Sequence, residues 1–95
     1  MAIGQILRFS GAGIDKYDAV QAELGWKDGK GEPAGLIAHA AGSTDDGFCV
    51  IEWWESARDW EVFFAQRLRP AFEKVADIPP QDITTFEVHN SYTAS

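Results

Sequence analysis

The side chains best suited to chemistry lie on two neighbouring expected strands. His39 stands between small residues, Ala38 and Ala40, which leave room beside its ring. An imidazole can take a proton from a phenol or an activated carbon at neutral pH. Glu52 is the one charged residue in the apolar run 48–54, and a carboxylate there can act on a substrate or hold the imidazole. These two residues therefore point to proton transfer, with His39 as the base.

Both residues also have structural interpretations. A histidine in a strand can simply form a hydrogen bond across a subunit interface, and a lone His39 does not decide between the two roles. A buried carboxylate usually has a partner, so Glu52 can instead pair with Arg8, Arg67 or a backbone donor.

The register of the expected hairpin decides which face His39 occupies. If His39 lies opposite Val50, it shares a face with Glu52 and lines a pocket. If it lies opposite Ile51 or Cys49, it points toward a subunit interface. A slip of one residue moves every side chain of a strand to the other face, so both placements stay open.

Four aromatic side chains are candidates for binding a flat substrate. Trp54, Trp60 and Phe64 run from the end of a strand onto one face of a helix, where they can form a flat-walled slot. The same spacing is equally typical of an ordinary core. Trp26 lies in a loop rich in Gly and Lys and is either a lid or a plug at the end of its own helix.

Composition excludes several function classes. The 95 residues predict one domain, 1–95, with net charge −7 and no basic run, so neither nucleic acid nor a membrane surface is an expected partner. Cys49 is the single cysteine, which excludes an intrachain disulfide. The start of the chain has no secretory signal and no apolar run reaches membrane-spanning length, so we expect a cytoplasmic protein.

Metal and cofactor sites are not expected. His39 and His89 are the only histidines, and no cluster has metal-ligand spacing. Residues 11–13, Gly-Ala-Gly, lack the further glycine of a nucleotide-binding fingerprint.

The pattern of elements predicts an α+β, ferredoxin-like fold. Strands are expected at 2–9, 34–41, 48–54 and 83–90, with a loop at 42–47 whose turn is Asp46-Gly47. One helix follows Asp15 as its N-cap and ends at Gly25. The other follows Ser56, breaks or kinks at 68–69 before Pro70, and ends at 79–80. Right-handed crossovers then place the first and third strands side by side, which we take to be parallel, with both helices on one face.

Residues 48–54 are apolar at both parities, so both faces of this strand should be buried. A chain of this length has helices for only one face of its sheet. The other face is expected to stack against a second copy, which makes a homodimeric α/β barrel.

A strand-ending Trp followed by a helix-capping Ser occurs at residues 54–56, and Ala57-Arg58-Asp59-Trp60 follows. With this junction, and along nearly its whole length, the chain resembles the dimeric α/β-barrel proteins of the antibiotic biosynthesis monooxygenase type. The resemblance implies a homodimer with a pocket between sheet and helices in each subunit. The activities that this resemblance implies as candidates include cofactor-free oxygenation of aromatic molecules, haem degradation, isomerisation and polyketide ring chemistry.

The chain also departs from that pattern. Haem-degrading relatives have an Asn on the first strand and a His on the second helix, and this chain has neither, so haem degradation is rejected. The missing helix His also weakens an oxygenase assignment. Residues 35–40, with His39 in the second strand, are most similar to small uncharacterised bacterial members.

Two functions follow. The first is a cofactor-independent monooxygenase or proton-transfer enzyme for a planar aromatic or polyketide-like molecule, in which Trp54 and Phe64 clamp the rings and Glu52 orients His39 or the substrate. The second is a non-catalytic binding or assembly protein. An open chamber beside His39 favours the enzyme, and a chamber filled by Trp54, Trp60 and Phe64 favours the second function.

Overall fold

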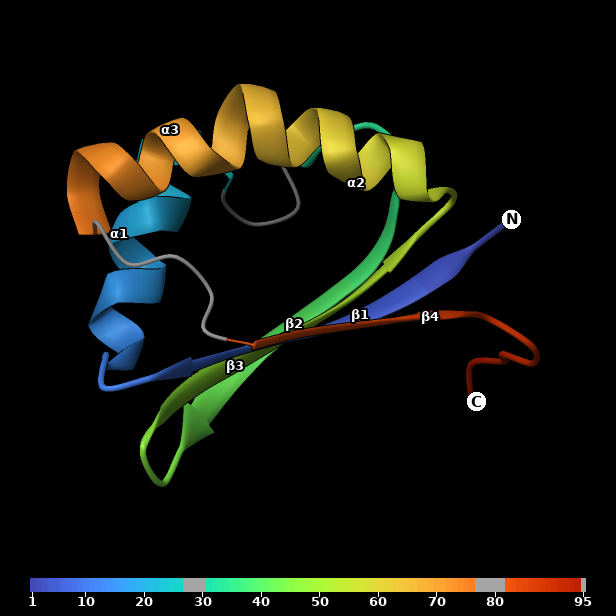
Figure 1. Ribbon diagram of the computed structural model, residues 1–95, viewed down its shortest axis with the longest axis horizontal. Helices are drawn as coiled ribbons and strands as arrows, with labels where there is room; N and C mark the ends of the chain where they lie inside the picture. The colour runs from blue at the N-terminus through green and yellow to red at the C-terminus, as the bar shows by residue number, and fades with distance from the viewer. Residues whose placement is uncertain (27–30, 77–81, 95) are drawn as a thin grey trace.

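The computed structural model describes residues 1–26, 31–76 and 82–94. Its strands and helices follow one another in the order that the sequence predicts, with one sheet and two helical segments (Figure 1). In chain order they are β1 (Ile3–Ser10), α1 (Ile14–Leu24), β2 (Leu36–Thr44), β3 (Gly47–Trp54), α2 (Ala57–Phe63), the π-helical turns η1 (Phe64–Leu68), α3 (Arg69–Ala71), a second π-helical stretch η2 (Phe72–Ala76), and β4 (Asp82–Glu87).

The four strands form one antiparallel sheet in the order β2-β3-β1-β4, and both helical segments lie on one side of it (Figure 1). The predicted ferredoxin-like fold is confirmed. β1 and β3 are neighbours, but they run antiparallel, so the prediction of a parallel pair is wrong. The crossover through α1 joins the parallel strands β1 and β2 with one strand's width between them. β3 fills that gap after a hairpin, and therefore runs opposite to both.

The faces of β3 are unequal. Its alternate residues Phe48, Val50, Glu52 and Trp54 are buried under the helices. The residues between them, Cys49, Ile51 and Trp53, are half-buried on the other face. The two-sided apolar character of residues 48–54 thus corresponds to one covered face and one apolar face with no helix over it.

The hairpin between β2 and β3 is tighter than predicted. β2 continues to Thr44 and β3 begins at Gly47, so the turn is Asp45-Asp46 and the expected loop at 42–47 is mostly strand. The Asp46 carboxylate accepts hydrogen bonds from the hydroxyls of Ser10 (2.9 Å) and Thr44 (3.2 Å). These bonds lower the pKa of Asp46 and hold the turn against the end of β1.

The ends of α1 follow backbone geometry more than side-chain capping. The N-cap is Gly13, whose carbonyl accepts from the Lys16 amide (3.0 Å), and Asp15 lies inside the first turn. The prediction of Asp15 as N-cap is therefore wrong, although its charge still suits the helix N-terminus. At the other end Gly25 has φ 72°, a left-handed conformation that favours glycine, and it ends the helix as predicted.

The second helical segment begins at the predicted cap. The Ser56 hydroxyl oxygen accepts from the Asp59 amide (3.2 Å) and donates to the Asp59 carboxylate (2.8 Å). Of the predicted kink or break at 68–69, the break does not occur: the helix widens into π turns at 64–68, where the Arg69 amide bonds to the Phe64 carbonyl, five residues back. A wider turn before Pro70 relieves the clash between the proline ring and the preceding turn. The predicted end at 79–80 lies outside the described residues.

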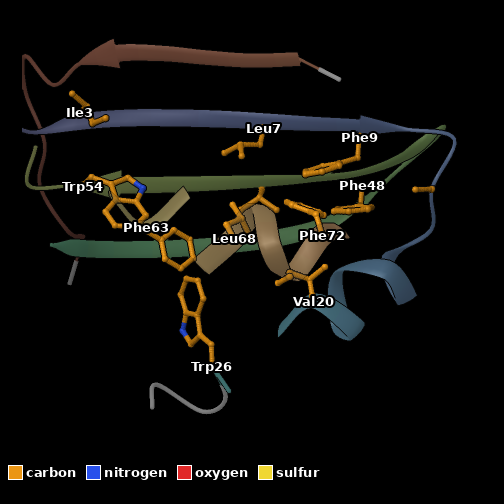
Figure 2. Close-up of a cluster of buried hydrophobic side chains, with 13 residues drawn as sticks. Ile3, Leu7, Phe9, Val20, Trp26, Phe48, Trp54, Phe63, Leu68 and Phe72 are labelled. Atoms are coloured by element: carbon orange, nitrogen blue, oxygen red, sulfur yellow. The ribbon is translucent and has the colours of Figure 1, made fainter. Parts of the chain in front are cut away.

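The core lies between the helices and the covered face of the sheet (Figure 2). Trp54 is wholly buried at one end of it, and the stacked rings of Phe9 and Phe48 lie at the other, 4.3 Å apart. After β4 the chain continues to Tyr92, which is 85% exposed. No helix among the described residues is long and apolar enough to cross a membrane.

Candidate active site

The hairpin register places His39 directly opposite Glu52. Residues opposite each other in an antiparallel pair point to the same face, so His39 faces the helices together with Val50, Glu52 and Trp54. Of the two placements that the sequence left open, this is the one that lines the interior. The His39 side chain keeps 16% of its surface exposed and that of Glu52 only 5%.

Four side chains form a chain of hydrogen bonds here. The Trp54 indole donates to Glu52 Oε1 (3.1 Å), Glu52 Oε2 lies 2.8 Å from His39 Nδ1, and His39 Nε2 lies 2.6 Å from the Tyr17 hydroxyl. An ionised carboxylate only accepts hydrogen bonds, so Nδ1 carries the proton. On a neutral ring Nε2 then accepts from Tyr17. The imidazole is thereby fixed in one tautomer with its basic nitrogen directed toward α1.

The structural partners considered for Glu52 are engaged elsewhere. Arg8 pairs with Asp82 at the surface (3.0 Å). Arg67 donates to the carbonyls of Leu24 (3.0 Å) and Gly31 (3.3 Å). The carboxylate of Glu52 is thus satisfied by a histidine and an indole and not by an arginine.

Sequence reasoning missed Tyr17 as a functional residue. It follows helical spacing with Val20 and Leu24, a pattern typical of the packing face of a helix. Its hydroxyl at the end of that face was the available signal, since buried tyrosines need a hydrogen-bond partner. Burial raises the pKa of Tyr17 above its ordinary value of 10.0, and the negative charges of Glu52 and Asp18 raise it further. Tyr17 is therefore a neutral phenol that donates a hydrogen bond.

A cavity lies beside this chain of polar groups, between the sheet and the helices. Its volume is about 30 Å³, room for roughly two water molecules. Tyr17, His39 and Glu52 are the titratable groups among the described residues that line it. The remaining lining is almost entirely apolar: Leu7, Phe9, Val20, Gln21, Trp26, Phe48, Val50, Phe63, Leu68 and Phe72.

Of the four aromatic residues predicted to bind a flat substrate, only one is among the described residues that line the cavity. Trp26 lines the cavity, with its ring centroid 4.5 Å from that of His39. Trp54, Trp60 and Phe64 are not among the described lining residues. Trp60 lies edge-on to Trp54, with ring centroids 5.9 Å apart, and is tilted against Phe64 at 5.3 Å. The chamber is therefore narrowed by Trp26 and not by the three rings considered in the sequence analysis.

A polar row crosses the whole sheet at the level of the site. His39, Glu52, Gln5 and Thr85 lie directly opposite one another on the four strands. Gln5 is wholly buried and its amide nitrogen donates to the Thr85 hydroxyl (3.3 Å), while its Oε1 has no partner among the described residues. No group of three or more His, Cys, Asp or Glu side chains in the described part of the chain is arranged to hold a metal ion.

Comparison with known proteins identifies solved structures that share this fold. No family model and no curated protein matches the chain. Among solved structures, SnoaB of Streptomyces nogalater, a cofactor-independent oxygenase, superposes with a TM-score of 0.68 at 14% identity over 95% of both chains. A Chloroflexus aurantiacus protein, provisionally described as an antibiotic biosynthesis monooxygenase, gives the same TM-score and identity over 98% of both chains.

A third structure comes from Thermobifida fusca. It is a dimeric ferredoxin-like protein of unknown function, with a TM-score of 0.60 and 17% identity over 93% of this chain and 92% of that one. Identities this low establish architecture and not activity. The resemblance inferred from the sequence is confirmed at that level: the chain has the ferredoxin-like fold of the antibiotic biosynthesis monooxygenase-like proteins.

Proposed function

We propose that this protein binds a small aromatic molecule and moves a proton from it to His39. The observation that carries the proposal is the chain from Glu52 through His39 to Tyr17, which ends in an apolar cavity. A histidine that lines a cavity, with its tautomer fixed by a buried carboxylate and its basic nitrogen next to a phenol, is the arrangement that a general base needs.

The chemistry follows from the roles of the atoms. When a substrate oxygen replaces His39 as the acceptor, the Tyr17 hydroxyl donates to that oxygen, and Nε2 becomes free to take a proton from an acidic C–H or O–H group. Tyr17 then stabilises the negative charge on the substrate oxygen. Glu52 stabilises the imidazolium, and the indole of Trp54 keeps Glu52 in place.

Oxygenation without a cofactor is the reaction that the comparison with SnoaB favours, because that protein is described as a cofactor-independent oxygenase. A deprotonated, electron-rich ring can react with O₂ directly. For an activated CH₂ group the balance is CH₂ + O₂ → C=O + H₂O, in which the substrate supplies the electrons and its two hydrogens leave as water. Quinols and anthrones are the substrate classes to test.

The uncovered face of the sheet supports a homodimer. A groove of about 460 Å³ lies between Ile37, Ala38 and Trp53 on one side and Ala2 and the segment 88–93 on the other. Ile37 is 57% exposed. Apolar surface of this kind is typical of an interface. The dimeric protein of the same fold from Thermobifida fusca supports stacking of two such sheets.

One observation favours the second function, a non-catalytic binding or assembly protein. The cavity as it stands admits no aromatic ring, since its volume is about 30 Å³. A pocket filled by the protein's own side chains would have this volume.

Oxygen uptake separates the two functions. Purified protein would be screened with quinols and anthrones of one to three rings, and wild type compared with His39→Ala and Trp54→Phe, which removes the donor to Glu52. We expect uptake that is lost in His39→Ala and reduced in Trp54→Phe. Equal uptake in all three proteins would exclude these roles.

A further inference from the structure

We infer that the indole of Trp26 occupies the position of the ligand's ring system, and that the ligand binds by displacing it. The ligand is then a neutral, planar molecule of about two fused rings, with one hydroxyl or carbonyl group. The inference rests on the proposed small-molecule site and adds what the site accepts and how it opens.

The contacts of Trp26 are those that a bound aromatic molecule would make. Trp26 is 9% exposed, and its ring is tilted by 51° against His39 at 4.5 Å and edge-on to Phe63 at 6.1 Å. Figure 2 shows the indole directed from the end of α1 toward the core, next to Phe63. A flat ring in this position therefore lies against the imidazole that the proposed function makes the base.

Trp26 is held differently from the other buried indole. Trp54 is wholly buried and donates a hydrogen bond to Glu52. The Trp26 ring is held by packing against His39 and Phe63, and its backbone amide bonds to the Gln21 carbonyl (3.2 Å) just past the left-handed residue Gly25. Its side chain can leave the cavity without breaking any of the hydrogen bonds that orient His39.

The size of the ligand follows from this exchange. The existing cavity of about 30 Å³ is too small for any ring, but it becomes continuous with the space of an indole when Trp26 leaves. A fused two-ring system matches that space. The ring plane is further restricted by Phe63 and Phe48, which line the same cavity.

The charge of the ligand follows from the lining. Glu52 contributes a carboxylate, and no Lys or Arg is among the described residues that line the cavity. Arg67 lies behind the lining, 5.6 Å from the Phe63 ring centroid, and its guanidinium donates to the carbonyls of Leu24 and Gly31. An anionic ligand would therefore meet a negative charge with no cation in contact with it, in a site of low dielectric constant. The Tyr17 hydroxyl and His39 Nε2 supply one donor and one acceptor, which suits a single hydroxyl or carbonyl on the ligand.

Calorimetric titration tests this with 2-naphthol as the probe and 2-naphthoate as its charged counterpart. Trp26→Ala should bind 2-naphthol about tenfold or more tighter than wild type, because wild type binds only from the fraction of molecules with Trp26 displaced. Trp60→Ala, which removes an indole that is not among the described lining residues, should bind like wild type. Neither variant should bind 2-naphthoate.

A second measurement uses wild-type protein labelled with 5-fluorotryptophan, in case Trp26→Ala does not fold. The ¹⁹F resonance of Trp26, assigned with Trp26→Phe, should move on addition of 2-naphthol more than that of Trp54. Unchanged affinity in Trp26→Ala, or equal gains in Trp26→Ala and Trp60→Ala, would overturn the inference. If Trp26→Ala is unfolded, a Trp26 resonance that does not shift when 2-naphthol is added to wild type would overturn the inference.

Failure of the proposed function looks different. Tight 2-naphthol binding by Trp26→Ala in a protein that transforms no substrate would remove the catalytic role and leave the ligand class standing. Turnover that depends on His39, without any effect of Trp26→Ala on binding, would remove this inference alone.

Discussion

Glu52 lies directly opposite His39 across the β2–β3 pair, and its carboxylate oxygen is 2.8 Å from His39 Nδ1. The site is thus built by the register of one hairpin. The two-residue turn at Asp45-Asp46, tied to Ser10 and Thr44, sets that register. A shift by one residue would move His39 to the uncovered face and separate it from Glu52 and Tyr17.

Glu52→Gln should lower kcat by about a hundredfold or more with little change in KM. A glutamine amide can donate to Nδ1, which moves the proton of the ring to Nε2 and removes the base. Steady-state kinetics on whichever quinol or anthrone the screen identifies would measure this. Glu55→Gln alters an exposed neighbour and should have wild-type kcat; equal losses in both variants would contradict the role of Glu52.

Tyr17 should make the protein lose stability at alkaline pH. Its pKa is raised in the folded state, so its contribution is complete below the unfolded value near 10.0 and is lost as pH rises through the folded pKa. Urea unfolding between pH 8 and pH 12 should show a steeper alkaline decline for wild type than for Tyr17→Phe. Tyr92→Phe, at an exposed tyrosine, should decline like wild type. Identical curves for wild type and Tyr17→Phe would contradict the burial of the phenol.

Gln5→Met should leave the free energy of unfolding unchanged or raise it. The wholly buried Oε1 of Gln5 has no partner among the described residues, and an unsatisfied buried acceptor is unfavourable by about 1–3 kcal/mol. Methionine keeps the shape without the acceptor. Gln66→Met, at an exposed position, is the control. A loss of more than about 1 kcal/mol in Gln5→Met would mean that the Oε1 atom of Gln5 has a partner, such as an internal water.

Ile37→Lys should weaken the proposed dimer. Ile37 lines the groove on the uncovered face of the sheet, where a second copy would desolvate the new charge. Val62→Lys makes the same change on α2, at a comparably exposed position. Sedimentation equilibrium at micromolar concentration should give a dimer for wild type and Val62→Lys, and a weaker dimer for Ile37→Lys. A folded, monomeric wild type would contradict the proposal.

The sequence predicted the parts of the fold that depend on local patterning. Residues 48–54 indicated a strand with two apolar faces, and Ser56 indicated the start of a helix; both are confirmed. The predicted direction of β3 relative to β1 was wrong. Strand direction follows from the connections between strands: the crossover through α1 keeps the chain direction and the hairpin reverses it. No single residue in either strand carries this information.

The site was predicted only in part for a similar reason. His39 and Glu52 could be singled out as polar residues in apolar strands. Tyr17 could not, because nothing in its spacing along α1 says which strand residue its hydroxyl meets, 22 positions away. Trp26 was recognised as a lid or a plug, but its contact with His39 depends on how α1 packs against β2.

Hydrogen–deuterium exchange under anaerobic conditions tests proton transfer most directly, since it needs no oxygen chemistry. The probe is 2-tetralone, a neutral two-ring ketone with an acidic CH₂ beside its carbonyl, in D₂O and followed by NMR. We predict that wild type accelerates exchange at that carbon and that His39→Ala lowers kcat by about 10²–10⁴-fold. Exchange at the buffer rate with wild type, or equal rates with His39→Ala, would contradict His39 as the base.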